Sequence, residues 1–277
     1  MTVKLFKAPT LRSLAFVVTA VAVGLGSLLM AGGADANQPT KPKPTIVLVH
    51  GAWADASSWN PVMQRLQREG YTVMAPANPL RGTLSDAAYI ASVLAGVPGP
   101  IVLVAHSYGG AVITNAATGN PNVEALVYVA AFIPDAGENG FDLLKFPGSL
   151  IVPPPSPDAT LTASPFPGGL DFYVKPDPFR NIFAADLPPD KTALMAAGQR
   201  PLAAAAFTDV SGPPAWKTIL AWALVATRDN TIGTANTRFM AQRAAPSRTV
   251  EIDASHAVLL SRPDAVVDLI HKAVHGI

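Results

Sequence analysis

The chain has no cysteine, little charge and no run of basic residues. Of its 277 residues, only 14% are Asp, Glu, Lys or Arg, and the net charge is +1. The lack of cysteine excludes disulfides, thiolate metal sites and a cysteine nucleophile. The near-neutral, unclustered charge gives no electrostatic footprint for nucleic acid, so we expect no nucleic-acid partner. The phosphate-loop pattern G-x-x-x-x-G-K followed by Ser or Thr is also absent.

Apolar residues are what the chain has in quantity, at 49% of the sequence. A chain of this length and composition can bury a sizeable core, as one large α/β domain or two small ones. Disorder is not expected, because disordered chains are poor in hydrophobic residues and rich in charge.

The first 36 residues have the features of a secretory signal. A basic start precedes an uncharged, mostly apolar run from Leu14 to Met30. The small-x-small pattern Ala34-Asp35-Ala36 then predicts cleavage after Ala36. The run is also long enough to cross a bilayer, so an uncleaved anchor is the alternative. We expect a secreted or periplasmic protein without a stable membrane anchor, in which residues 37–44 form a proline-rich linker.

Apolar runs of strand length alternate with segments of helical spacing along most of the remaining chain. Such runs fit parallel strands that are covered on both faces. The expected strands are 45–50, 71–75, 101–104, 124–131, 218–226 and 248–252. The segments between them have helical spacing, with a helix start at Ser85-Asp86 and a last helix from Pro263. This alternation predicts a doubly wound, mostly parallel sheet flanked by helices.

The alternation stops between Phe132 and Pro214, where prolines are frequent. A stretch this long without strands is either disordered or a functional lid. Its aromatic residues favour a packed lid; they are Phe166, Phe172, Tyr173, Phe179, Phe183 and Phe207. We therefore expect one domain over residues 45–277, with a lid inserted at about 132–214.

The sequence Ala105-His-Ser-Tyr-Gly-Gly110 joins an apolar strand to a helix-compatible segment. A serine at such a strand-to-helix turn is the context of a nucleophile elbow, whose usual pattern is G-x-S-x-G. The turn needs small residues two before and two after the serine, which Ala105 and Gly109 provide. The pattern departs from the usual one by a single methyl group, and a helix-capping serine is the plain alternative. Ser107 is thus the candidate nucleophile.

A serine nucleophile needs a base, and that base needs a carboxylate to orient it. In a doubly wound sheet these groups belong at the carboxyl ends of strands. His256 meets this condition, because it follows the strand 248–252 and precedes the last helix. Of the other histidines, we expect His50 to shape a turn and His106 to point away from the serine. His271 and His275 are expected to serve packing or the surface rather than a metal.

Three carboxylates could orient His256. Asp229 follows the strand 218–226 by three residues and gives the chain order Ser, Asp, His. Asp135 lies just past the strand 124–131 and is the rival. Asp253 is close to His256 in sequence, which makes it difficult for its side chain to reach beneath the ring.

The negative charge that develops during acyl transfer needs two backbone N–H donors. One is expected from Tyr108, directly after the serine, and the other from Ala52 in the loop after the first strand. Trp53 and Phe132 flank these positions and are candidate substrate contacts. The lid aromatics Phe172, Tyr173 and Trp216 have no assignable place from sequence.

Several of these stretches resemble the α/β-hydrolase superfamily, over roughly residues 45–275. The similarity is carried by Val47-Leu-Val-His-Gly-Ala-Trp53, Ser58-Trp59, Ala105-His-Ser-Tyr-Gly-Gly110, Leu126-Val-Tyr-Val-Ala-Ala-Phe132, Asp229 and Ser255-His256. The chain looks most like the branch of plant methyl-ester esterases and hydroxynitrile lyases and its bacterial relatives. The resemblance implies the triad Ser107, Asp229 and His256, with oxyanion donors Ala52 and Tyr108.

The same resemblance separates two reactions. Lyase members carry a threonine after the first-strand histidine and a lysine after the catalytic histidine, where this chain has Gly51 and Ala257. Ester hydrolysis is therefore favoured over cyanohydrin cleavage. We expect a serine hydrolase of the carboxylesterase type that acts on a small-molecule ester, with no cofactor and no metal. A lactonase, an amidase or a cofactor-free perhydrolase on the same triad is the alternative. A non-catalytic binding protein on this fold is a third hypothesis.

Overall fold

The computed structural model of the protein describes residues 42–277, and its centre is a sheet of six parallel strands. The strand order is β2-β1-β3-β4-β8-β9. The strands are β1 (Thr45–Val49), β2 (Val73–Met74), β3 (Ile101–His106), β4 (Val123–Val129), β8 (Leu220–Ala226) and β9 (Thr249–Ile252). The prediction of a doubly wound parallel sheet is confirmed.

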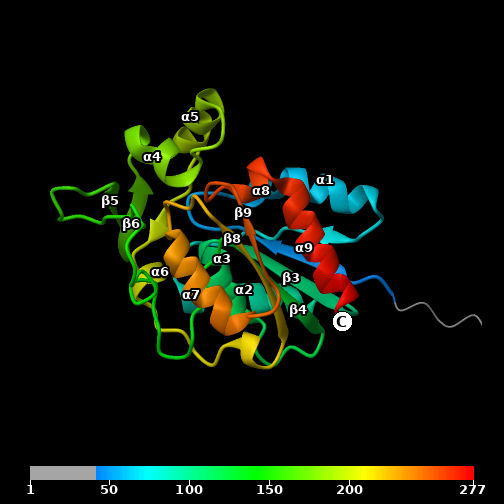
Figure 1. The fold of residues 1–277 in the computed structure, drawn as a ribbon. Helices are drawn as coiled ribbons and strands as arrows, with labels where there is room; N and C mark the ends of the chain where they lie inside the picture. Colours follow the sequence, from blue (N-terminus) through cyan, green and yellow to red (C-terminus); the bar gives the residue numbers. More distant parts are fainter. Residues whose placement is uncertain (1–41) are drawn as a thin grey trace, which may run out of the picture. The chain divides into compact units, whose positions relative to one another are not determined.

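Helices cover both faces of this sheet (Figure 1). One face carries η1 (Ala56–Trp59), α1 (Asn60–Arg68), α8 (Val258–Ser261) and α9 (Pro263–His275). The other carries α2 (Thr83–Ala95), α3 (Tyr108–Ala116) and α7 (Thr234–Ala244). Alternate residues of β3 enter the two cores: Leu103 packs on the α3 side and Val104 on the α9 side. This is why the strand sequences are continuously apolar rather than alternating.

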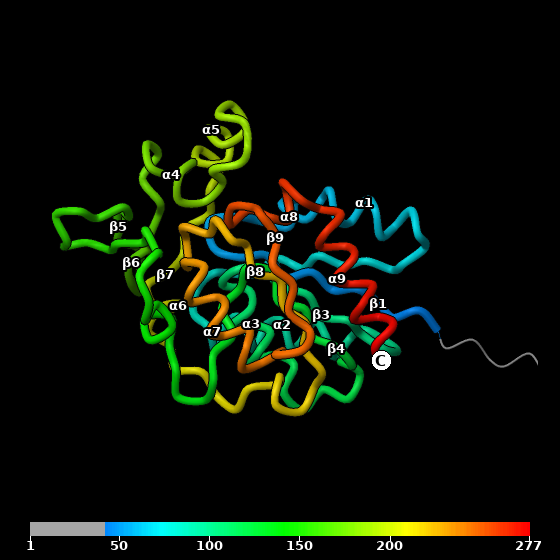
Figure 2. The backbone as a smooth tube through the Cα atoms, viewed as in Figure 1, coloured from blue at the N-terminus to red at the C-terminus, as the bar shows by residue number. Residues whose placement is uncertain are grey.

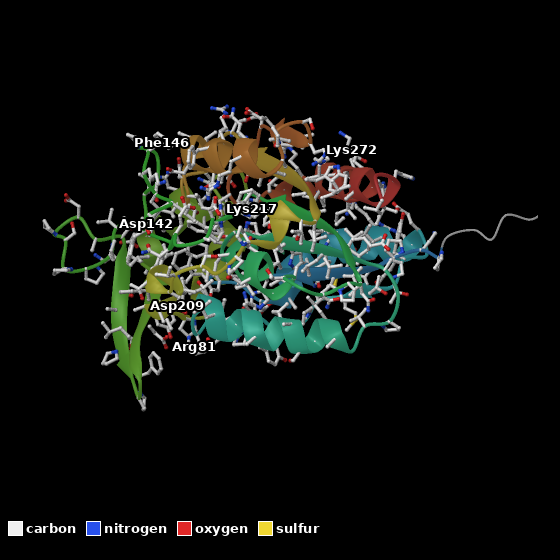
Figure 3. The ribbon with its side chains drawn as sticks, turned by 90° about the horizontal axis from the view of Figure 1, so that it is seen from below. Arg81, Asp142, Phe146, Asp209, Lys217 and Lys272 are labelled. Atoms are coloured by element: carbon white, nitrogen blue, oxygen red, sulfur yellow. The ribbon has the colours of Figure 1, made fainter. Side chains whose placement is uncertain are left out.

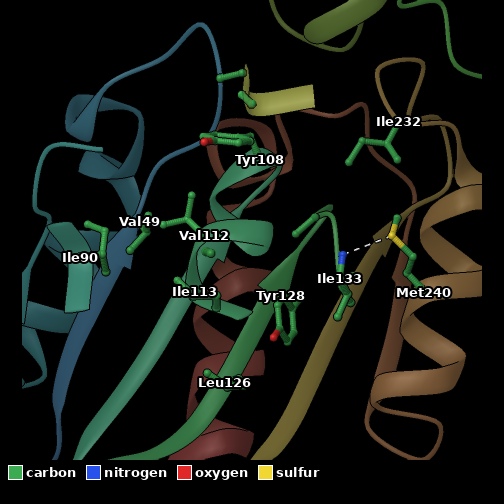
Figure 4. Close-up of a cluster of buried hydrophobic side chains, with 14 of the residues drawn as sticks. Val49, Ile90, Tyr108, Val112, Ile113, Leu126, Tyr128, Ile133, Ile232 and Met240 are labelled. Carbon is green, nitrogen blue, oxygen red and sulfur yellow. Dashed lines mark hydrogen bonds between the residues drawn. The ribbon is translucent and has the colours of Figure 1, made fainter. Parts of the chain in front are cut away.

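The core on the α3 side reaches up to the carboxyl ends of the strands. Val49, Val112 and Leu126 pack there, and none of the three has measurable exposure (Figure 4). The Tyr128 hydroxyl lies in the same core and is paired with the Thr114 hydroxyl at 2.9 Å. β3, β4 and α3 therefore share one core directly below the turn that carries Ser107.

The segment between β4 and β8 is packed, but the expectation that it contains no strand is wrong. It holds a three-stranded antiparallel sheet and three helices, and Figure 2 follows the backbone out from β4 and back to β8. Its elements are β5 (Leu161–Phe166), β6 (Gly169–Val174), α4 (Pro176–Phe183), α5 (Pro189–Ala197), β7 (Leu202–Ala203) and α6 (Ala205–Thr208). The short η2 (Ala215–Lys217) follows just before β8. We call residues 132–214 the cap.

The hairpin was missed because Pro165 lies inside β5 and most of that strand is exposed. A proline in a short polar run argues against a strand. Because most of β5 is exposed, no buried face marks the strand with large apolar residues at alternate positions. The turn between β5 and β6 did carry a signal, since Pro167-Gly168 are its central residues and Gly168 has φ 113°. That conformation suits the glycine of a proline-glycine turn.

The cap is tied to the loop before α2. Arg81 lies 2.8 Å from an Asp171 carboxylate oxygen of β6, and the Ala203 N–H donates to the Leu80 carbonyl at 3.0 Å. Asp209, at the end of α6, accepts from the Leu84 N–H at 3.3 Å. Arg81 and Asp209 are both labelled near this end of α2 in Figure 3.

Two smaller sequence expectations differ from the structure. The strand expected at 71–75 is limited to Val73–Met74. It lies at the edge of the sheet and pairs with β1. The helix expected from Ser85-Asp86 begins at Thr83 instead. Asp86 lies inside its first turn, fully buried, where its carboxylate accepts from the Arg81 N–H at 3.1 Å. Asp86 therefore binds the backbone just before the helix, but it does so from the first helical turn and not from the N-cap position.

The predicted signal segment and most of the predicted linker lie outside the described residues. Among the helices between residues 42 and 277, none is long and apolar enough to cross a membrane.

Candidate active site

Ser107 stands alone between the last residue of β3 and the first residue of α3. Its backbone has φ 54° and ψ −127°, a conformation that residues other than glycine rarely adopt. The neighbouring chain is packed so closely that small residues are required. A Cβ added at Gly109 would lie 2.7 Å from the Val49 carbonyl oxygen, and one at Gly51 would lie 2.6 Å from Ser107 Cβ. This strained, crowded turn directs the serine side chain toward the carboxyl edge of the sheet.

Two side chains form a hydrogen-bonded chain with Ser107. His256 Nε2 lies 2.8 Å from Ser107 Oγ, and His256 Nδ1 lies 2.8 Å from Asp229 Oδ2. The elements that bring them together are the turns after β3, β8 and β9, which all end at the same edge of the sheet. All three residues are at most 2% exposed.

The remaining contacts of Asp229 define its role in this chain. Its other carboxylate oxygen accepts the backbone N–H groups of Thr231 at 2.8 Å and Ile232 at 3.0 Å. An ionised carboxylate only accepts hydrogen bonds, so the proton between Asp229 and the ring belongs to His256 Nδ1. Nε2 is then free to accept the Ser107 hydroxyl proton, which is the arrangement of a base beside a nucleophile.

The rival carboxylates lie elsewhere. Asp135 pairs with Lys217, and Asp253 pairs with Arg228 at 2.6 Å, with its own side chain 76% exposed. Neither carboxylate contacts His256. The structure therefore brings together the first of the three sequence candidates, Asp229.

The other buried histidines have structural partners. His106 Nε2 donates to the His256 carbonyl at 2.9 Å, and the two rings lie 4.6 Å apart. Burial, together with the nearby His256, holds the pKa of His106 well below its usual value, so His106 stays neutral. His50 Nε2 accepts the Asn78 N–H at 2.9 Å, which leaves Nδ1 to donate to the Gly51 carbonyl. Burial lowers the pKa of His50 as well.

Two backbone N–H groups lie at the serine without an acceptor. The N–H groups of Ala52 and Tyr108 have no hydrogen-bond partner in residues 42–277, and both residues line the cavity that contains Ser107. Tyr108 is also the first residue of α3, so its N–H is one of the unpaired donors at that helix start. Donors of this kind can stabilise an oxyanion.

The side chain of Tyr108 has a role that the sequence did not indicate. Its hydroxyl donates to Asp86 Oδ2 at 2.8 Å, and both residues are buried. Burial raises the pKa of the Asp86 carboxyl, which the hydrogen bonds from Tyr108 and the Arg81 loop partly oppose. This contact fixes Tyr108 from α2. Because it joins residues 22 positions apart, no local sequence pattern reports it.

The cavity above Ser107 is narrow and mostly apolar, with a volume of about 30 Å³. The predicted contacts Trp53 and Phe132 both line it, together with cap residues such as Leu143 and Phe207. Trp53 is held by its indole N–H, which donates to the Phe172 carbonyl at 3.0 Å. Glu138 and Asp209 line the same cavity and are its acidic groups.

The unplaced lid aromatics lie around this cavity rather than in it. Phe172 packs edge-on against Phe207, and the Trp216 indole donates to the Pro134 carbonyl at 2.8 Å. Tyr173 is half-buried on β6 and pairs with Thr162 across the hairpin. Across residues 42–277, no group of three or more His, Asp or Glu side chains could hold a metal ion.

The alpha/beta hydrolase family matches residues 46–269. The chain belongs to the alpha/beta hydrolase family. This confirms the resemblance noted in the sequence, and membership supports the prediction of a hydrolase.

Individual members of this hydrolase family share the fold more clearly than the sequence. Polyneuridine aldehyde esterase superimposes with a TM-score of 0.71 at 18% identity, covering 83% of this chain and 99% of its own. The methylesterase MES16 from Arabidopsis gives 0.66 at 20%, covering 84% and 100%. A pyrethroid hydrolase from Sphingobium faniae JZ-2 gives 0.65 at 22%, covering 84% and 97%.

One curated relative is similar in sequence over part of the chain. It is a carbendazim-hydrolyzing esterase from Nocardioides sp. (strain SG-4G), 32% identical over 111 residues. The match covers 35% of this chain and 46% of that esterase. The chain is thus similar to slightly less than half of the relative.

Proposed function

We propose that this protein is a serine hydrolase that cleaves small, neutral carboxylic esters through an acyl-enzyme. The observation that carries the proposal is the chain from Ser107 Oγ through His256 to Asp229, with 2.8 Å at each link. It lies beside two unpaired N–H groups in an apolar cavity. No metal or organic cofactor is needed for this chemistry.

The reaction follows from the placement of the groups. Ser107 Oγ attacks the carbonyl carbon while its proton passes to His256 Nε2, and the carbonyl oxygen becomes an oxyanion held by Ala52 and Tyr108. Collapse of this intermediate breaks the bond to the alcohol, which takes the proton from Nε2. Water then attacks the acyl group on Ser107 in the same way and releases the acid. Asp229 stabilises the imidazolium that forms twice in this cycle.

Two positions favour hydrolysis over lyase chemistry. At Gly51, a Cβ would lie 2.6 Å from Ser107 Cβ, so the site as built has no room for a threonine. Ala257 is fully buried and offers no charged group beside His256. Both helpers that lyase members carry at these positions are therefore missing, while nothing that hydrolysis requires is lost.

The cavity supports a small and uncharged acyl group. Its lining is mainly apolar, with side chains such as Leu143, Leu144 and Phe207. A hydrogen-bonded contact with Arg243 lowers the pKa of Glu138 to about 2, so this lining carboxylate stays ionised at neutral pH. Arg243 neutralises this charge, and no Lys, Arg or His side chain of residues 42–277 lines the cavity. A carboxylate on the substrate would therefore be buried without a counter-charge, so anionic esters are expected to be poor substrates.

The test is a substrate panel with wild type and Ser107→Ala. We expect turnover of p-nitrophenyl acetate and butyrate that exceeds turnover of the matched anilide and of a small lactone. Ser107→Ala should lose at least about 10³-fold in kcat while its thermal unfolding stays cooperative. Carbendazim belongs in the panel, because the partly matching relative is named for its hydrolysis. Full ester turnover by Ser107→Ala would contradict the proposal.

We also propose that the protein is exported and cleaved after Ala36, on the strength of the N-terminal pattern alone. N-terminal sequencing of the protein isolated from the periplasm or medium should give Asn37. A protein that retains residue 1 in the cytoplasm would contradict this.

A further inference from the structure

The loop that carries His256 is held by the cap on both sides of the histidine. On one side, the Ser255 N–H donates to Asp186 Oδ2 at 3.0 Å, and the Ser255 hydroxyl donates to Asp186 Oδ1. On the other side, the Ala257 N–H donates to the Phe183 carbonyl at 3.0 Å. Both partners come from the end of α4 and the turn that follows it. The two residues that flank His256 are therefore fastened to one short segment of the cap, residues 183–186.

The ring of His256 touches the same segment. The Phe183 ring lies edge-on to the His256 imidazole, with 5.1 Å between centroids, and also packs against His106 at 6.2 Å. The core side contributes one backbone contact, from His106 to the His256 carbonyl. The sheet side also holds the ring itself, through the 2.8 Å contact of Nδ1 with Asp229, so the position of His256 depends on contacts from both the sheet and the cap.

Asp186 is the polar group of this contact. Burial acts to raise the pKa of its carboxyl, but hydrogen bonding, chiefly from Ser255 with a smaller contribution from Ser261, holds the pKa below its usual value. The carboxylate is therefore ionised across the working range of an esterase. Hydrogen bonds to an ionised acceptor are stronger than neutral ones, and the acceptor here takes two from one residue.

We propose that Asp186 is a positioning residue for His256, so that the cap helps to set the catalytic base. The proposal rests on the proposed function, since it assigns the base to His256. His256 must hold two hydrogen bonds from opposite ring nitrogens, to Ser107 and Asp229, and a displacement of about 1 Å in such an arrangement can cost about 10²-fold in rate. Asp186 touches no reacting atom. It acts through Ser255 by limiting where the main chain of His256 can lie.

The experiment compares Asp186→Ala, Asp186→Asn and the matched cap variant Asp171→Asn on the full chain. Asp171 is a buried cap carboxylate and Asp186 a half-buried one, but Asp171 contacts Arg81 and not the His256 loop. The measurements are kcat and KM for p-nitrophenyl butyrate, the rate of fluorophosphonate labelling of Ser107, and the midpoint of thermal unfolding.

Asp186→Ala should lower kcat and the labelling rate about 10- to 100-fold, with KM changed less than about twofold. Asp186→Asn keeps an oxygen that accepts from Ser255 and should recover most of the rate. Asp171→Asn should stay within about twofold of wild type in kcat, whatever it does to the unfolding midpoint. Ser255→Ala should give an intermediate loss that does not add to that of Asp186→Ala, because both act on one interaction.

The proposal is overturned if Asp186→Ala lowers the unfolding midpoint but leaves kcat and labelling within about twofold of wild type. It is also overturned if Asp171→Asn reduces kcat as much as Asp186→Ala, since the effect would then belong to cap stability in general. Failure of the proposed function has a different signature, namely ester turnover that survives Ser107→Ala. If Asp186→Ala does not fold, the comparison of Asp186→Asn with Ser255→Ala decides, because the first should be close to wild type and the second should not.

Discussion

At the scale of single residues, the geometry of the site depends on small residues next to Ser107 as well as on Ser107 itself. Ser107 adopts its unusual backbone because the loops after β1 and β3 pass within contact of each other. Gly51 and Gly109 are the residues that permit this approach, and each faces backbone or side-chain atoms closer than 3.0 Å from an added Cβ. A methyl group at Gly109 would collide with the carbonyl oxygens of Val49 and His50.

This predicts the effect of Gly109→Ala. The new Cβ would lie 2.7 and 2.9 Å from backbone oxygens, which cannot move without shifting β1. We expect a loss of about 1–3 kcal/mol in the free energy of unfolding, together with a strong loss of esterase activity. Urea denaturation of the two proteins measures the first effect.

Gly96→Ala is the matched control. Its added Cβ would make only an ordinary contact, 3.5 Å from the Val93 carbonyl oxygen, and Gly96 has φ −86°. The free energy of unfolding should change by less than about 0.5 kcal/mol, since the substitution also reduces the freedom of the unfolded chain. Equal stabilities for Gly109→Ala and Gly96→Ala would contradict the packing argument.

At the scale of elements, the first part of the cap is joined to α7 through charged contacts. The loop after β4 is held to α7 by Glu138, which accepts from Arg243 Nη1 at 2.9 Å and also from Nη2. The same carboxylate accepts from the Asp135 N–H at 2.9 Å. These bonds shape the first part of the cap, beside the cavity.

The pH dependence of this contact is predictable. The hydrogen bonds from Arg243 lower the pKa of Glu138 in the folded protein to about 2, below its ordinary value of 4.5. A group with a lowered folded pKa stabilises the protein above its unfolded pKa, and that contribution is lost as the pH falls from about 4.5 to about 2. Glu138→Gln should therefore unfold at a lower temperature than wild type at pH 7, and the difference should shrink below pH 4.5 and vanish near pH 2.

Thermal unfolding of wild type and Glu138→Gln at pH 7, 4 and 2.5 measures this. Glu251→Gln is the control, because Glu251 pairs with Arg238 at the surface, where both side chains are more than 40% exposed. Such an exposed pair should contribute little at any of the three pH values. A pH-independent difference for Glu138→Gln would show that the ion pair is not its cause.

The sequence predicted the elements of the sheet much better than those of the cap. Each strand of the sheet is an apolar run, and parallel strands bring their carboxyl ends to one edge, which is why Asp229 and His256 could be placed beside Ser107 before any coordinates. β5 is neither an apolar run nor part of the parallel sheet. Pro165 interrupts it, and most of its residues are exposed. The contacts of Asp86 with Tyr108 and of Asp186 with Ser255 join residues 22 and 69 positions apart. Only the folded chain brings such pairs together, so no local pattern could report them.

At the scale of the whole described domain, the candidate site lies where two differently built parts meet. The parallel sheet supplies Ser107, Asp229 and His256 from the turns after three strands. The cap contributes apolar walls to the cavity and fastens the His256 loop through residues 183–186. The sheet therefore places the three side chains together, and the cap shapes the cavity and holds the two neighbours of His256 in the chain.

We propose that Ser107 is a nucleophile activated by His256. The most direct measurement is labelling of the intact protein with a fluorophosphonate, followed by mass spectrometry of its peptides and by the labelling rates of wild type and His256→Ala. We predict one phosphonylated site, on the peptide that contains Ser107, and at least about a 10³-fold slower reaction for His256→Ala. A label on another serine, no label at all, or equal rates for the two proteins would contradict the claim.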